Sequence, residues 1–247
     1  MMLSELKKLG YQVEVHSHAR AILEVDFPEV EVELTEALRN FKIPVEELIA
    51  GGGGEAKGTQ RLRKDLAGKK WPKFHFHVER KINGKLLESQ SHEVDHVREL
   101  PAGRIALEIE WNNKDPFFDR DLENYKRLHA DGAISVGIII TRGTSLHENM
   151  KEAVGKFLDG NQISTLDGLT NWGYEPTYRQ RKAIDNLINR THAPLLFREA
   201  FCRKFVADKF GEATTHWRKL EDRVQRGVGN PCPLLLIGLP DGIIDFA

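Results

Sequence analysis

The sequence predicts an α/β fold in which a mixed central sheet is flanked by helices. In Leu107-Glu108-Ile109-Glu110-Trp111 apolar and acidic residues alternate, which is typical of a β-strand. Residues 134–141 form a largely apolar run, typical of a strand covered on both faces. Between the two strands, the segment from Asp119 to His129 has a helix-like pattern. The order strand, helix, strand predicts neighbouring strands in one covered sheet.

The first fifty residues precede a glycine run, and we expect them to form a segment separate from the core. Residues 1–50 are acidic, and residues 34–48 have helical spacing. Gly51–Gly54 predicts a flexible joint, and residues 51–247 are expected to form the core. The run is not a nucleotide-binding loop, because it continues with Lys57-Gly58-Thr59 in place of Gly-Lys-Ser/Thr. We therefore expect no nucleotide cofactor.

Two further strands are predicted before residue 107. Residues 71–78 alternate aromatic or apolar with polar side chains, and Asn83-Gly84 is a strong signal for a hairpin turn. The returning strand, residues 85–97, carries Asp95 near its end. Residues 98–103 then turn the chain, so that the strand bearing Glu108 runs back beside it. We expect Asp95 to approach Glu108 across these neighbouring strands.

Three carboxylates should therefore converge at one place. Glu108 and Glu110 share one strand face, and on a covered sheet each ionised group costs several kcal/mol unless it is paired or metal-bound. Converging carboxylates repel one another and favour a cation, and such hard oxygen ligands suit Mg²⁺ better than zinc. This pattern predicts a metal site that cleaves phosphodiester bonds. The alternative is a strand with one solvated face, on which alternating glutamates have no function.

Composition agrees with an ordinary enzyme-sized protein. With 247 residues, 40% of them hydrophobic, the chain can bury one substantial core. The first residues lack the apolar centre of a signal peptide and no apolar run is long enough to span a bilayer, so a cytoplasmic protein without a membrane partner is expected. Cys202 and Cys232 lack the spacing of a zinc site or disulfide framework.

Several landmarks follow one another along the chain: Gly58-Thr59-Gln60, Lys64-Asp65-Leu66, Trp71, Asp95, residues 107–113, Pro116-Phe117 and residues 137–143. In this order they resemble the type II restriction endonucleases of the PD-(D/E)xK fold, most closely the BglII group, which is related to BamHI. Residues 233–239 match the closing strand of the family, and residues 177–228 before them have a helical pattern. The resemblance covers most of the chain after Gly54 and implies a restriction-endonuclease-like fold.

The resemblance assigns roles to four positions at the acidic strand. It implies that Asp95 and Glu108 bind the metal with their carboxylates and that Ile109 contributes its backbone carbonyl. Glu110 departs from the common pattern: the wider fold usually places lysine here, the BglII enzyme has glutamine and BamHI has glutamate. Glu110 would either orient or deprotonate the attacking water or help to hold the metal, and the sequence leaves both roles open.

Candidate DNA contacts lie in four segments. Asn112 and Asn113, followed by Lys114, match the family segment near the bases, and asparagine can pair with adenine; the alternative is a polar turn. The loop that begins at Arg142 opens at the same sheet edge. A local excess of basic residues suits contacts with DNA phosphates and includes Lys57, Arg61, Lys64 and Lys73. The alternative is a solvated helix face. Hydroxyl and basic groups further on suit phosphates and base edges, unless they serve packing: Thr214, Thr215, His216 and Arg218.

The expected function is Mg²⁺-dependent, sequence-specific cleavage of double-stranded DNA. The resemblance implies products with a 5′-phosphate and a 3′-hydroxyl. One site per chain implies a homodimer whose two-fold axis matches that of a palindromic target. Two alternatives remain at this point: a DNA-binding module that no longer cleaves, and a structure-specific repair nuclease of the same fold.

Overall fold

A mixed five-stranded sheet forms the centre of the protein. The computed structural model describes residues 3–51 and 54–246, so Gly52 and Gly53 of the predicted joint lie outside the described residues. The strand order is β1-β8-β7-β6-β5, in which β8, β7 and β6 are parallel while β1 and β5 are antiparallel to their neighbours. The strands are β1 (Gln12–His16), β5 (His96–Leu100), β6 (Gly103–Glu110), β7 (Val136–Arg142) and β8 (Leu234–Leu239).

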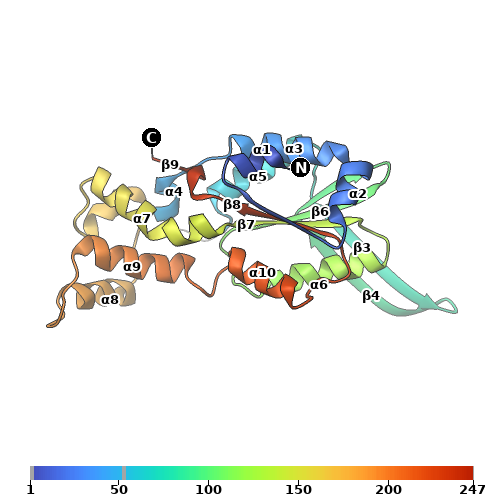
Figure 1. Ribbon diagram of the computed structural model, residues 1–247. Coiled ribbons are helices and arrows are strands. Elements are labelled where there is room, and N and C mark those ends of the chain that lie inside the picture. Colours follow the sequence, from blue (N-terminus) through green and yellow to red (C-terminus); the bar gives the residue numbers. More distant parts are fainter. Residues whose placement is uncertain (1–2, 52–53, 247) are drawn as a thin grey trace.

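Helices cover both faces of this sheet, as Figure 1 shows. One face packs against the N-terminal helices α1 (Ser4–Lys8), α2 (Ala19–Asp26) and α3 (Pro28–Arg39), with α5 (Lys57–Gly68) alongside. The opposite face packs against α6 (Phe117–Ala130) and α10 (Trp217–Gln225). The predicted α/β fold with a mixed, helix-flanked sheet is confirmed.

A helical extension continues the molecule at one end of the sheet. It contains α7 (Thr144–Gly160), α8 (Tyr178–Ile188) and α9 (Phe197–Phe210), and α4 (Val45–Ile49) packs on α7. Short elements complete the chain: β2 (Ile43–Pro44), β9 (Ile244–Asp245) and the 3-10 turns Asp167–Trp172 and Asp241–Ile243. None of the described helices has the length and apolarity needed to cross a bilayer.

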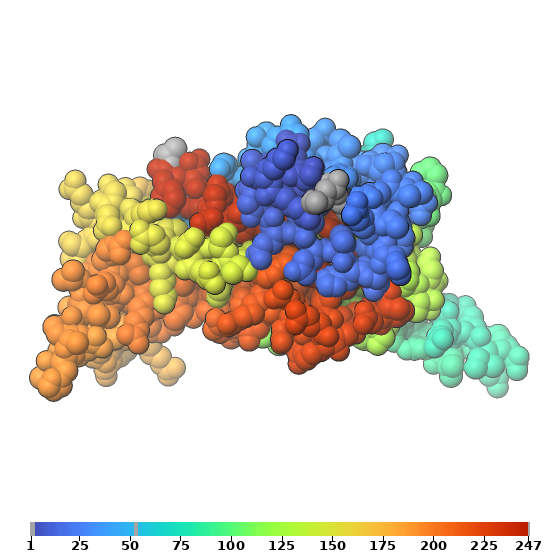
Figure 2. Space-filling model, in the orientation of Figure 1, coloured from blue at the N-terminus to red at the C-terminus, as the bar shows by residue number. Residues whose placement is uncertain are grey.

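A two-stranded ribbon projects from the other end of the molecule (Figures 1 and 2). It consists of β3 (Phe74–Ile82) and β4 (Lys85–Val94), joined by the predicted turn at Asn83-Gly84, where both residues have positive φ. The returning strand differs from the prediction, because the chain bends at Asp95 and continues as β5 in the central sheet. The bend leaves Asp95 beside the sheet, at the level of Glu108 on β6.

The pleat of the central strands separates two hydrophobic cores. Leu107 and Ile109 of β6 join the core that contains the N-terminal and extension helices. Ala106 joins the core beneath α6 and α10. Glu108 and Glu110 share the Ala106 face by the period of the strand, as the sequence predicts.

The boundary predicted between residues 50 and 51 does not divide the described structure. β1 pairs with β8 at the edge of the central sheet, and Leu3, Leu6 and Leu34 belong to the same buried core as Ile138 of β7. The predicted continuous helical spacing over residues 34–48 is interrupted by β2, which separates α3 from α4. The N-terminal segment is therefore part of the core.

Candidate active site

Glu108 and Glu110 lie in the interior, on the face of β6 that α6 covers. Each is only 3% exposed. Burial, followed by the charge of Asp121, raises the pKa of Glu110 to about 9. The same two causes raise the pKa of Glu108. Ionising both carboxyls in this place therefore requires a compensating positive charge.

Asp95 completes the predicted trio from the bend between β4 and β5. Its backbone N–H donates to Oε2 of Glu108 at 3.4 Å, and its charge contributes to the raised pKa of Glu108. Its carboxylate is 46% exposed and lies 3.5 Å from Nζ of Lys73. The structure thus brings Asp95 and Glu108 together, with Asp95 on the solvent side.

Asp121 of α6 is a fourth acid, which the sequence reasoning missed. It is completely buried, and its Oδ2 has no hydrogen-bond partner in the described structure. Asp121 lies one turn before Tyr125, a residue whose hydroxyl donates to the carbonyl of Ile138 on β7. A signal was present: Asp121 occupies the stripe of Phe118, Leu122 and Tyr125, which face the sheet.

Two polar side chains hold Glu110 and Asp121. Nδ2 of Asn113 donates to Oε2 of Glu110 at 2.7 Å. Arg120 lies 2.7 Å from Oδ1 of Asp121 and 3.6 Å from Oε1 of Glu110. One half-exposed guanidinium cannot neutralise three buried carboxyls, and this leaves the cluster with an acidic excess suited to a divalent cation.

A surface cavity of about 760 Å³ opens beside Asp95. Ile109, Asn112 and Asn113 line it together with Lys57 and Arg63 of α5. A neighbouring groove joins Asp95 to Lys64 and Lys73. The exposed acid therefore borders several basic side chains, among them Arg63, which was not among the predicted contacts and pairs with Glu55 at 3.0 Å.

The comparison with protein families agrees with this geometry. Residues 11–239 match the family model described as restriction endonuclease BglII/BglIII. The chain belongs to the BglII/BglIII restriction endonuclease family. The resemblance seen in the sequence is confirmed, and membership makes the chain a site-specific deoxyribonuclease of a typically metal-dependent family. A search of curated proteins gave no match.

The predicted DNA contacts of this BglII-family enzyme fall into different environments. Lys57, Lys64 and Lys73 lie in the two grooves beside Asp95. Arg61 lines neither groove; it pairs with Glu47 at 2.6 Å and donates to the carbonyl of Lys42. The structure therefore brings three of these four basic residues to the site.

Arg142, Thr215 and His216 require a correction, because all three are buried. The guanidinium of Arg142 donates to the backbone carbonyls of Trp111, Phe210 and Thr215 and to the hydroxyl of Thr214. These side chains are not available to phosphates or base edges. Arg142 instead ties the end of β7 to the loops at residues 111 and 210–215.

The segment at Asn112 to Lys114 rests on the loop before α10. The N–H of Thr215 donates to the carbonyl of Asn113 at 2.8 Å, and the hydroxyl of Thr215 accepts from the N–H of Asn113. Lys114 forms an isolated antiparallel β-bridge with Thr214, and its side chain is exposed. Arg218 is also exposed and pairs with Glu212. Asn113, Lys114 and Arg218 keep the exposure that a DNA contact needs.

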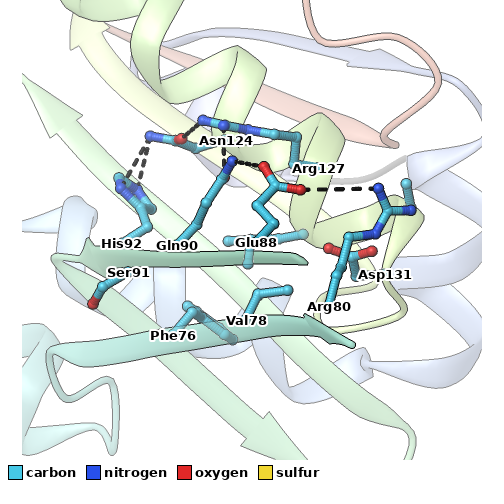
Figure 3. Close-up of a pocket in the computed structure, with 12 residues that line it drawn as sticks. Phe76, Val78, Arg80, Glu88, Gln90, Ser91, His92, Asn124, Arg127 and Asp131 are labelled. Atoms are coloured by element: carbon cyan, nitrogen blue, oxygen red, sulfur yellow. Dashed lines mark hydrogen bonds and ion pairs between the residues drawn. The ribbon is translucent and has the colours of Figure 1, made fainter. Parts of the chain in front are cut away.

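A second cavity, of about 330 Å³, lies between the ribbon and α6 (Figure 3). Its polar side chains satisfy one another: Asn124 lies 3.0 Å from His92, and Arg127 donates to Gln90 at 2.8 Å. The nearest approach of Arg80 to Glu88 is 4.0 Å. These contacts join the ribbon to α6 and bring no acids together in this cavity. The acidic cluster, formed by Asp95, Glu108, Glu110 and Asp121, is therefore the better catalytic candidate.

Proposed function

We propose that this enzyme is a type II restriction endonuclease that makes Mg²⁺-dependent double-strand cuts at a specific DNA sequence, leaving a 5′-phosphate and a 3′-hydroxyl. The observation that carries the proposal is the convergence of Asp95, Glu108, Glu110 and Asp121. Three of these carboxyls are buried and one is exposed to a basic groove. Together they provide hard oxygen ligands next to a surface that suits phosphates.

Asp95 and Glu108 are the proposed metal ligands, with the carbonyl of Ile109 as a further one. Bound Mg²⁺ would neutralise the charge of the scissile phosphate and lower the pKa of a water molecule bound to the metal. Two features fit a cation: Oδ2 of Asp121 has no hydrogen-bond partner among the described residues, and burial with neighbouring acids raises the pKa of Glu108.

Glu110 is proposed to act on the attacking water. Asn113 holds Oε2, so Oε1 is directed toward Arg120 and the rest of the cluster. Burial raises the pKa of this carboxyl to about 9, so it would accept a proton from water at neutral pH only once a bound cation has favoured its ionised form. The neighbouring groove residues Lys57, Lys64 and Lys73 would position the phosphates.

The test is incubation of phage-sized double-stranded DNA with purified protein, with Mg²⁺ or with EDTA. Glu108→Gln removes a proposed ligand, and Glu123→Gln is the matched control, since Glu123 lies on α6 and pairs with Lys126. We expect discrete Mg²⁺-dependent fragments that Glu108→Gln abolishes and Glu123→Gln retains. Intact DNA in every lane would contradict cleavage and favour a binding module, while cutting that depends on ends or nicks would favour a repair nuclease.

A further inference from the structure

A second group of potential metal ligands lies outside the acidic cluster. His147 is in the first turn of α7, and Glu212 and His216 come from the loop before α10. One ligand atom from each lies within 4.8 Å of the other two. We propose that these three side chains bind a transition-metal ion of the Zn²⁺ type, at a site distinct from the proposed Mg²⁺ site.

The buried imidazole of His216 is the strongest indication of a ligand. Its side chain is 2% exposed, and its Nε2 has no hydrogen-bond partner within the described residues. The nearest carboxylate oxygen, Oε2 of Glu212, lies 3.7 Å away, beyond hydrogen-bonding distance. A buried nitrogen without a partner is destabilising, and a bound metal would remove that cost.

The two imidazoles are already arranged on one carboxylate. Their rings stack with centroids 3.9 Å apart and planes 9° from parallel. Nε2 of His147 lies 3.4 Å from Oε1 of Glu212, and Nε2 of His216 faces the other oxygen. A metal lies near the plane of each imidazole that binds it, so ligation requires these parallel rings to rotate until their nitrogens converge on a point beside the carboxylate.

The chemistry of the three ligands selects the kind of ion. Two histidines and one glutamate form a common donor set for zinc, whereas Mg²⁺ prefers oxygen ligands alone. The site borders a cavity of about 590 Å³, lined also by Thr144, Lys151 and Phe210, which leaves space for a water as the fourth ligand.

Two cationic side chains lie next to the proposed ligands. Nη1 of Arg142 contacts Nδ1 of His147 at 3.4 Å, but the same nitrogen also donates to the carbonyl of Phe210. Arg218 pairs with Glu212, and its side chain is 69% exposed, so it can turn into solvent. Binding through Nε2 would leave the proton of His147 on Nδ1, so Nδ1 could no longer accept from Arg142.

A metal bound at this site would stabilise the position of a loop next to the proposed active site. The loop that carries Glu212 and His216 is joined to residues 113–115 by two backbone hydrogen bonds, Thr215 to Asn113 and Asp115 to Ala213, and by the hydroxyl of Thr215, which accepts from the N–H of Asn113. Asn113 in turn holds Glu110. Fixing this loop to α7 would therefore restrain the side chain that positions Glu110, and this consequence, unlike metal binding itself, rests on the proposed function.

The test separates this site from the acidic cluster by using full-length Glu108→Gln protein as the background. After treatment with a chelator, the protein is titrated with Zn²⁺ by calorimetry and with Co²⁺ by visible absorption. We expect one tight equivalent of Zn²⁺ and the absorption bands of tetrahedral Co²⁺. Adding Glu212→Gln or His147→Gln should weaken Zn²⁺ binding at least ~10-fold.

His192→Gln is the matched control, because His192 is exposed between α8 and α9. Glu212 is 60% exposed, so its variant is the one least able to disturb folding, and circular dichroism checks both variants. Absence of a tight Zn²⁺ equivalent, or binding that neither variant weakens, would overturn the proposal and leave the stacked histidines as a packing contact. These readouts do not depend on DNA cleavage.

Discussion

At the scale of single residues, the buried carboxyls of the acidic cluster destabilise the folded protein when ionised, and a bound metal ion would offset this effect. Burial raises the pKa of Glu108, Glu110 and Asp121, and the charge of Asp121 raises the pKa of the two glutamates further. A protein that needed these positions only for packing would be more stable with neutral side chains there. Their presence is understandable if the site works with a cation.

Metal-free protein should therefore lose stability as pH rises. The pKa of Glu110 is raised from 4.5 to about 9, so between these values the folded state binds a proton that the unfolded state has released. The contribution of the neutral Glu110 carboxyl to the free energy of unfolding is complete below the unfolded-state pKa. It is lost as pH rises through the folded-state pKa, by at most about 1.4 kcal/mol per pH unit for one proton. Melting temperatures in EDTA should fall across this window.

Glu110→Gln should flatten that pH dependence, whereas Glu123→Gln should leave it unchanged. Mg²⁺ binds the ionised carboxylates, so it should restore most of the stability at the alkaline end. A melting temperature that rises with pH in wild-type protein without metal would refute this account of the cluster.

At the scale of elements, the basic residues of α5 have different surroundings. Lys57 and Lys64 border the grooves at Asp95, whereas Arg61 of the same helix is occupied by Glu47. The double variant Lys57→Ala/Lys64→Ala should weaken DNA binding and reduce the slope of log affinity against log salt by ~0.9 for each phosphate that the variant no longer neutralises. Fluorescence anisotropy with Ca²⁺ in place of Mg²⁺ measures this slope.

Arg61→Ala is the control on the same helix and should leave the slope within experimental error. An equal reduction from Arg61→Ala would mean that the ion pair with Glu47 opens when DNA binds. The DNA contact that the sequence predicts for Arg61 would then hold.

The close packing of α6 on β7 is a second property of the elements, and it sets the position of Asp121. A Cβ on Gly137 would lie 2.3 Å from the ring of Tyr125. Gly137→Ala should therefore displace α6, cost about 1–3 kcal/mol in unfolding free energy, and reduce cleavage. Urea unfolding and a cleavage assay test both effects, with Gly160→Ala as control because that glycine has open space around it.

At the scale of the molecule, local sequence signals located the acidic strand but not all of its surroundings. The alternation at Glu108 and Glu110 and the Asn83-Gly84 turn predicted β6 and the ribbon, because both depend on neighbouring residues. β1 was missed although Val13 and Val15 alternate with Glu14 and His16, since its partner β8 lies near the other end of the chain. Asp121 and the buried state of Arg142 likewise depend on distant packing.

One acidic cluster per chain has to be reconciled with a cut through both DNA strands. We propose that two copies act together, each cutting one strand of a two-fold symmetric target. Differently tagged wild-type and Glu108→Gln chains can be co-expressed and the mixed species purified. The mixed dimer should nick supercoiled plasmid at a rate within about twofold of wild type, while conversion of the nicked circle to linear DNA should fall by at least ~100-fold, because the second strand meets a site without its metal ligand.

The wild-type homodimer purified through both tags is the control and should give linear DNA directly. Linear product from the mixed species at the wild-type rate would show that a single site cuts both strands in turn. If no mixed species is recovered, and the protein bound to cognate DNA sediments as a monomer, the proposed dimer is contradicted.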